Sequence, residues 1–97
     1  MAIRVELRGR LIQRPETRVT PAGTTVVRCE VDCGENAGEL VISVVMAGER
    51  ARELSGLAAG RQIRAAGALR AIRGRLPGRS VQQGIEVIAE EISPDLT

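Results

Sequence analysis

The 97-residue sequence contains no Phe, Trp or Tyr, no histidine, no lysine and only two cysteines. Without aromatic rings, it lacks the side chains on which unstacked bases usually stack. The lack of histidine and of a cysteine cluster argues against a zinc site. With no paired acidic motif and no Gly-rich phosphate loop before a helix, we expect neither an enzyme nor a bound cofactor. No apolar run approaches the ~20 residues of a membrane span, and no leader segment precedes the first predicted strand, so we expect a soluble cytoplasmic protein with no membrane partner.

The two cysteines, Cys29 and Cys33, are four residues apart. On a strand this spacing puts them on one face but about 13 Å apart, given a rise of about 3.3 Å per residue. A disulfide needs Cα atoms within about 7 Å of each other. We therefore interpret them as thiols of a hydrophobic core.

All fourteen basic residues are arginine, and the charge is uneven along the chain. Residues 1–28 carry a net charge of +4, residues 29–60 one of −4, residues 61–80 one of +6 and residues 81–97 one of −4. The guanidinium group matches the geometry of phosphate, and such blocks favour a folded surface with separate basic and acidic zones. The alternative is that arginine replaces lysine because of a GC-rich genome, and that the blocks cancel in space.

Alternation of apolar and polar residues predicts five strands. The clearest pattern is IRVELRGRLI at residues 3–12. Gly9 within it predicts a bulge or bend, as found where a small barrel turns a corner. The predicted strands cover residues 3–12, 24–33, 39–47, 61–70 and 81–92.

The segments between these strands carry turn or helix signals. Residues 13–23, with two prolines and a glycine, predict a loop or hairpin, and residues 34–38 predict a turn. Apolar residues at helical spacing predict one short helix over 49–59, which ends before Gly60. Residues 71–80, rich in Arg and Gly, predict a basic hairpin loop.

Three strands, a short helix and two more strands predict an all-β domain with the five-stranded Greek-key barrel of the OB-fold. We expect one domain over residues 1–93, followed by a short end at 94–97. The strand at 39–47 is apolar on both faces, although a small barrel has its core on one side only. Its second face, formed by Val41, Val45 and Ala47, should therefore meet a ligand or another subunit.

Several segments resemble bacterial single-stranded DNA-binding proteins. The run GRLIQRPETRVTPAG at 9–23 is similar to that family's pattern G-x-L-x-x-x-P-E-x-R-x-T-P-x-G. SVVMAGE at 43–49 resembles its R-V-V-x-F-G-K segment, and Gly60 with GALR at 67–70 resembles K-G-x-x-V-x-V-x-G-x-L-R. EVIAEEI at 86–92 resembles the last strand, T-x-V-V-A-E-x-I. The match covers nearly the whole chain.

The resemblance implies single-stranded DNA as partner, a homodimer or homotetramer, and a nucleoid-associated role in bacterial replication, recombination or repair. The related primosomal replication protein N shares the P-x-x-x-V-[ST]-P-x-G pattern and implies a replication-restart or helicase partner. The chain ends at 95–97 without the acidic, Phe-bearing tail that recruits partners in this family. It would then be a tail-less paralogue, a protein of the primosomal type, or a shortened form.

The family's base-stacking rings would fall near Val41, Ala47 and Gly74, and its Arg before the V-V pair is Ser43 here. Each lost stacking contact is worth roughly 1–3 kcal/mol. Arginine could offset part of this loss by contacting phosphate or by stacking its flat guanidinium on a base. The candidate nucleic-acid-binding residues are Arg28, Arg70, Arg73, Arg75 and Arg79, with weaker candidates in Arg14, Arg18 and Ser43.

Two main hypotheses follow. The first is a sequence-independent single-stranded DNA-binding protein that relies on arginine–phosphate contacts and is therefore sensitive to salt. The second is an oligomeric OB-fold assembly module that has lost most of its affinity for DNA. The missing rings and the two-sided apolar strand favour the second, whereas the basic segment at 70–79 favours the first. A solvated loop that discourages aggregation is the simplest alternative for that segment.

Overall fold

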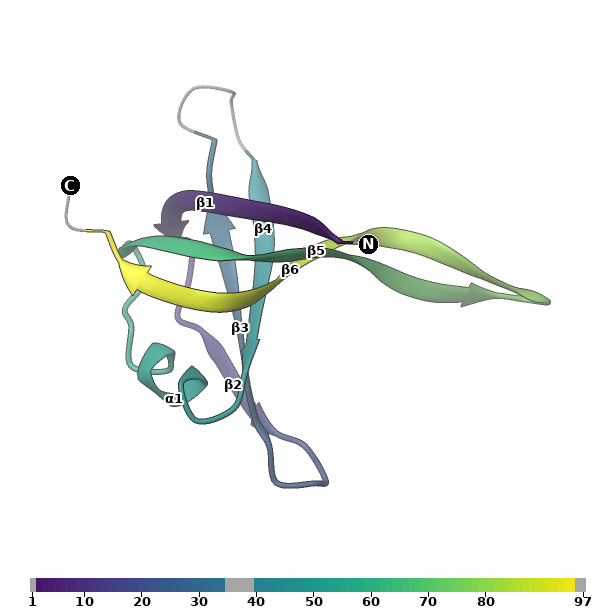
Figure 1. Ribbon diagram of the computed structural model, residues 1–97, viewed down its shortest axis with the longest axis horizontal. Coiled ribbons are helices and arrows are strands. Elements are labelled where there is room, and N and C mark those ends of the chain that lie inside the picture. Colours follow the sequence, from purple (N-terminus) through teal and green to yellow (C-terminus); the bar gives the residue numbers. More distant parts are fainter. Residues whose placement is uncertain (1, 35–39, 96–97) are drawn as a thin grey trace.

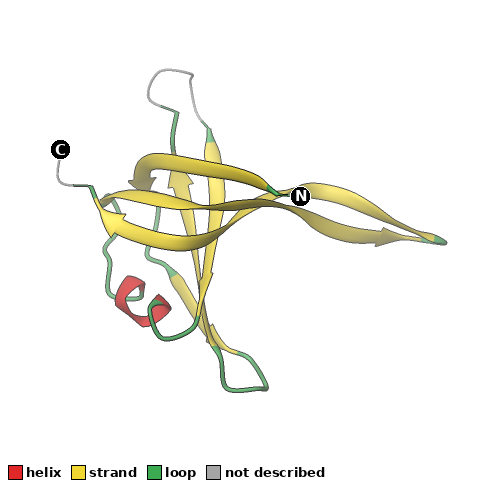
Figure 2. Ribbon diagram, in the orientation of Figure 1, coloured by secondary structure: helices red, strands yellow, loops and turns green. Residues whose placement is uncertain are grey.

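The computed structural model describes residues 2–34 and 40–95, which form six strands and one short helix (Figure 2). In chain order these are β1 (Ile3–Leu11), β2 (Glu16–Val19), β3 (Thr25–Asp32), β4 (Val41–Ala47), α1 (Ala51–Leu54), β5 (Gln62–Leu76) and β6 (Arg79–Pro94). The alternating patterns of the sequence therefore correspond to strands. Period two places one set of side chains inward and the other outward.

The sheet closes into a ring. Its strand order is β1-β5-β6-β4-β3-β2, and β1 also pairs with β3. The closure occurs next to Gly9: Arg10 pairs with both β5 and β3, and Leu11 pairs with β3. A Cβ on Gly9 would meet the Asp32 backbone and the Val31 side chain. All pairings are antiparallel except β4 with β6. This ring confirms the predicted five-stranded OB-fold, with β2 as an additional short strand outside β3.

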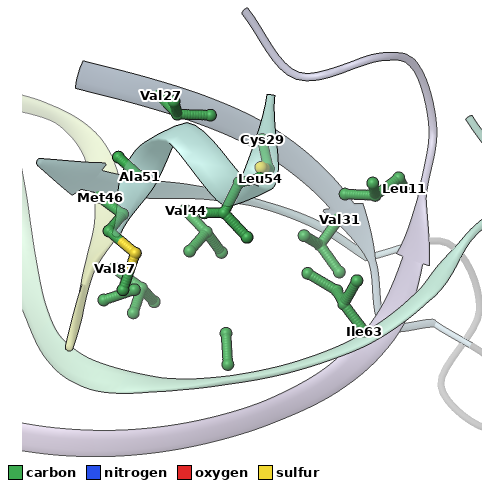
Figure 3. Close-up of a cluster of buried hydrophobic side chains, with 12 residues drawn as sticks. Leu11, Val27, Cys29, Val31, Val44, Met46, Ala51, Leu54, Ile63 and Val87 are labelled. Atoms are coloured by element: carbon green, nitrogen blue, oxygen red, sulfur yellow. The ribbon is translucent and has the colours of Figure 1, made fainter. Parts of the chain in front are cut away.

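The core inside the ring is built from aliphatic side chains (Figure 3). The inward face of β3 supplies Val27, Cys29 and Val31, all at most 1 % exposed. The helix α1 packs near one end of the ring, where it buries Ala51 and Leu54 (Figures 1 and 3). Cys29 is thus a core thiol as predicted, whereas Cys33 is only partly buried beside the core.

The segment at 71–80 is not a loop, which corrects the expectation from its glycines and proline. β5 and β6 continue through it as a long hairpin that projects away from the barrel (Figure 1). Only Pro77 and Gly78 lie between the two strands, and Gly78 has a φ of 82°. Proline followed by glycine at positive φ is the pattern of a type II turn. The breaker residues therefore form the turn itself, and the arginines lie on strands.

Three further expectations concern the segments between the predicted strands. The helix spans one turn, Ala51–Leu54, instead of 49–59, because Gly56 disfavours helix and no side chain caps its N-terminus. The segment at 13–23, expected to be a loop or hairpin, forms a hairpin in which β2 pairs with β3; β2 itself was not among the predicted strands. The predicted turn at 34–38 lies, after residue 34, outside the described residues. No helix in the described ranges is long and apolar enough to cross a membrane.

Candidate nucleic-acid interface

The outward face of β3, β4, β6 and β5 gathers the candidate residues into rows. In one row Arg28 on β3 lies opposite Val45 on β4, which lies opposite Ile88 on β6. In the next row Ser43 on β4 lies opposite Glu86 on β6, which lies opposite Arg70 on β5. Because side chains alternate along a strand, this face is separate from the core. The ladder register thus places Arg28 and Arg70, which are far apart in sequence, on one surface.

Glu86 joins these two arginines. Arg28 Nη2 donates to Glu86 Oε2 at 3.1 Å, and Arg70 donates to Oε1 from Nη2 at 2.6 Å and from Nε at 3.1 Å. The Glu86 side chain is 6 % exposed, whereas those of Arg28 and Arg70 are 41 % and 61 % exposed. A buried carboxylate requires such partners. One negative charge therefore holds two cations and leaves a net positive charge at the surface.

Beside this cluster, the outward face is hollowed into an open groove of about 430 Å³. Its floor includes the aliphatic side chains of Val45, Ala47 and Ile88. The groove collects five of the predicted residues: Arg18, Arg28, Arg70, Val45 and Ala47. The remaining lining residues are Glu16, Thr17 and Val26. An apolar floor bordered by guanidinium groups can receive a ligand that is both flat and anionic.

The projecting part of the β5–β6 hairpin holds three more of the predicted arginines. Arg73, Arg75 and Arg79 are exposed, and none forms an ion pair with any residue that the structure describes. Alternation along β5 puts Arg73 and Arg75 on the hairpin face opposite to that of Arg70. Arg79, which lies opposite Leu76, shares the face of Arg70. The predicted basic cluster is therefore spread over both faces of the hairpin.

Three predicted residues lie apart from the groove. Arg14 is exposed in the segment between β1 and β2. Ser43 donates a hydrogen bond to Glu30 at 2.7 Å, so its hydroxyl is engaged within the sheet. Val41, at the start of β4, is 42 % exposed and does not line the groove. The second apolar face of β4 thus divides into a groove part and an open part.

Sequence reasoning missed the residues that organise the groove. Glu86 lies between Ile85 and Val87 on the last predicted strand, and period two assigns it to the outward face. Nothing local marks it as buried, because its arginine partners come from other strands. Ile88, two residues further, could have been found from the same alternation as a member of that face. Glu16 and Thr17 belong to β2, which was not among the five predicted strands.

The chain is similar to known proteins in both sequence and fold. A family model described as "another single-strand binding protein family" matches residues 4–81. Among solved structures, a deletion variant of the single-stranded DNA-binding protein from Thermus aquaticus is 28 % identical with a TM-score of 0.80. The wild-type protein from the same organism is 26 % identical with a TM-score of 0.79. Both are covered only in part: the whole of this chain spans 42 % and 41 % of theirs.

A third similar structure is the second single-stranded DNA-binding protein of Mycobacterium smegmatis. It is 21 % identical with a TM-score of 0.79, and the match covers 99 % of this chain and 91 % of that one. At this identity the likeness concerns the fold. No sequence among the curated proteins matches the chain.

Proposed function

The chain belongs to this family of single-strand binding proteins, and from that premise we propose that it binds single-stranded DNA without sequence preference, mainly through contacts between arginine and phosphate. The observation that carries the proposal is the placement of its cations. Arg73, Arg75 and Arg79 are exposed on the projecting hairpin and have no ion-pair partner among the described residues, and Arg18, Arg28 and Arg70 line the groove at its base. A strand lying in the groove would meet Arg18, Arg28 and Arg70. Its continuation along the hairpin would meet Arg79 on the same face, and Arg73 and Arg75 where it wraps around to the other face.

The chemistry of these side chains sets the expected strength of binding. Arginine–phosphate contacts release counterions, so the logarithmic salt slope is about −0.7 for each phosphate neutralised on a single strand. Aromatic stacking, which elsewhere supplies roughly 1–3 kcal/mol per base, is absent. We therefore expect binding that is weaker and more salt-dependent than in proteins whose grooves contain rings. Replication, recombination and repair are the processes in which such binding would act.

The test is fluorescence anisotropy of labelled oligo-dT over a salt series. Replacing Arg73, Arg75 and Arg79 by alanine should make the salt slope shallower by about 2, if each arginine neutralises one phosphate. A matched control replaces Arg10, Arg52 and Arg61, which are exposed, lie outside the groove and form no ion pair within the described chain. It removes the same charge and should change the slope much less. Equal effects of both variants, or no binding of oligo-dT at low salt, would contradict the proposal.

A second candidate function is an oligomeric assembly module with little affinity for DNA. It is favoured by exposed aliphatic side chains on three strands, namely Ile3 at 64 %, Val41 at 42 % and Ile85 at 46 % exposure. We propose that the protein forms homodimers or homotetramers in which such side chains are covered. Light scattering measures the assembly directly. A stable oligomer that leaves oligo-dT unbound at low salt would select this second function.

A further inference from the structure

We propose that Glu86 positions the guanidinium planes of Arg28 and Arg70 so that DNA bases stack on them in place of aromatic rings. The inference rests on the proposed function and names the part of the groove that contacts bases. It assigns the hairpin arginines to phosphate and the Glu86-bound pair to bases. Glu86 itself is a positioning residue, since its carboxylate is buried beneath the arginines.

The hydrogen bonds approach each guanidinium from its edge. Arg70 uses Nε and Nη2, which lie on one edge of the group, to donate to the single atom Glu86 Oε1. Arg28 uses Nη2 to donate to the other oxygen, Oε2. Hydrogen bonds in the plane of a guanidinium leave its two faces free. The carboxylate can thus fix the orientation of both planes without covering them.

Exposure and surroundings fit a base better than a phosphate alone. The side chains of Arg28 and Arg70 remain 41 % and 61 % exposed, and both border the groove floored by Val45, Ala47 and Ile88. Aliphatic groups beside a flat cation suit the face of a nucleobase, whereas a phosphate gains nothing from an apolar floor. Because the arginines are already ordered, they lose little side-chain entropy when a base arrives.

Glu86 also reduces the value of these arginines as phosphate ligands. Its charge offsets one of the two cations, and three of their N–H groups are already used. Arg73 and Arg75, which form no ion pair within the described chain, carry no such restriction. The two groups of arginines should therefore respond differently to the removal of bases from the ligand and to the replacement of arginine by lysine.

The experiment compares oligo-dT with an abasic deoxyribose-phosphate chain of equal length, both measured by anisotropy. The readout is the ratio of the two affinities, which reports contacts to bases. Replacing Arg28 and Arg70 by lysine keeps the charge but removes the plane. We expect this ratio to fall by a factor of about 2 to 30 for each arginine. The matched control, Arg73→Lys with Arg75→Lys, should leave the ratio unchanged.

A second variant, Glu86→Gln, keeps the shape of the side chain and removes its charge. The ratio should fall here as well, while the salt slope becomes steeper by up to about 0.7 because a freed arginine can neutralise a phosphate. If Glu86 had only a structural role, a folded Glu86→Gln variant would show neither the lower affinity ratio nor the steeper salt slope. Thermal unfolding shows whether the variant is folded. An unchanged ratio in the lysine variant, or a wild-type ratio of unity, would overturn the inference. Failure to bind either ligand would instead contradict the proposed function, and the inference with it.

Discussion

Arg70 lies directly opposite Glu86 in the β5–β6 ladder, and its Nη2 is 2.6 Å from Glu86 Oε1. The pair lies where the hairpin leaves the barrel, and Arg28 extends it across β4 to β3. Exposed ion pairs stabilise proteins by about 0–1 kcal/mol, but a buried carboxylate that loses its partners keeps the cost of desolvation. The cluster therefore stabilises the base of the hairpin and also shapes the groove.

Removing both arginines should destabilise the protein. For Arg28→Ala with Arg70→Ala, we expect the free energy of unfolding to fall by about 1–3 kcal/mol, because Glu86 loses the three charged hydrogen bonds that these arginines donate to it. Urea denaturation followed by circular dichroism measures this. Arg4→Ala is the comparison, since Arg4 pairs with Glu90 at 2.6 Å where both side chains are about 60 % exposed; its loss should destabilise the protein much less, because water screens an exposed pair. Similar losses in the two variants would show that burial of Glu86 does not matter.

Adding a ring to the groove should restore stacking. Ala47 is exposed and lines the groove, so Ala47→Trp places an indole where a base can reach it. We expect affinity for oligo-dT to rise about 5- to 150-fold, from roughly 1–3 kcal/mol per stacked base. Because the chain has no other tryptophan, quenching of its fluorescence reports the contact directly.

The control for this variant is Ala59→Trp, at an exposed position between α1 and β5. Its fluorescence and the affinity for oligo-dT should change little when DNA is added. Equal quenching at both positions, or an unchanged affinity of Ala47→Trp, would place the DNA elsewhere on the molecule.

The alternation of apolar and polar residues predicted the strands of the barrel, because this pattern depends only on each strand's own sequence. Val27, Cys29 and Val31 alternate with polar residues, and a half-buried strand requires this pattern whatever its partners. The same rule placed Arg28 outward. A basic hairpin at 71–80 was predicted, but not that both strands continue through it, because its glycines and proline read as loop signals although only Pro77 and Gly78 make the turn.

The groove depends on long-range register, which local patterns do not contain. Arg28, Arg70 and Glu86 come from three strands, and only the pairing of β3 with β4, β4 with β6 and β6 with β5 brings them together. Composition could suggest the hypothesis that arginine replaces aromatic rings, but it could not predict which arginines share a carboxylate. The division of the candidate arginines into a groove set and a hairpin set therefore required the structure.

Gly9 and Gly56 should respond differently to replacement by alanine, because only Gly9 lies where the ring closes. A Cβ on Gly9 would meet the Asp32 carbonyl and the Val31 side chain at the point where β1 joins β3, so Gly9→Ala should cost about 1–3 kcal/mol through overpacking. A Cβ on Gly56 would meet no such neighbour within 4 Å, and the φ of Gly56 is not positive. Gly56→Ala should therefore be neutral or stabilising by up to about 1 kcal/mol. Thermal and urea unfolding measure the stability of both variants. Similar losses of stability in Gly9→Ala and Gly56→Ala would contradict the prediction.

The buried thiol of Cys29 predicts a loss of stability at alkaline pH. Burial, with a smaller contribution from the charge of Glu30, raises the pKa of Cys29 from 9.0 to about 11. A raised folded-state pKa means that the folded protein holds the proton more tightly, so this stability is fully present below pH 9 and is lost as the pH rises through 11. The expected loss, once the thiol is fully ionised, is at most about 3 kcal/mol.

The composition makes this measurement unusually direct. Tyrosine and lysine, which titrate in the same range, are absent from the chain. In a Cys33→Ser background, the ultraviolet absorbance of the thiolate should therefore report Cys29 alone, with a midpoint near pH 11. Denaturation in urea should move this midpoint back toward pH 9, and Cys29→Ala in the same background should abolish the absorbance change. A folded-state midpoint near 9 would mean that the thiol is open to water.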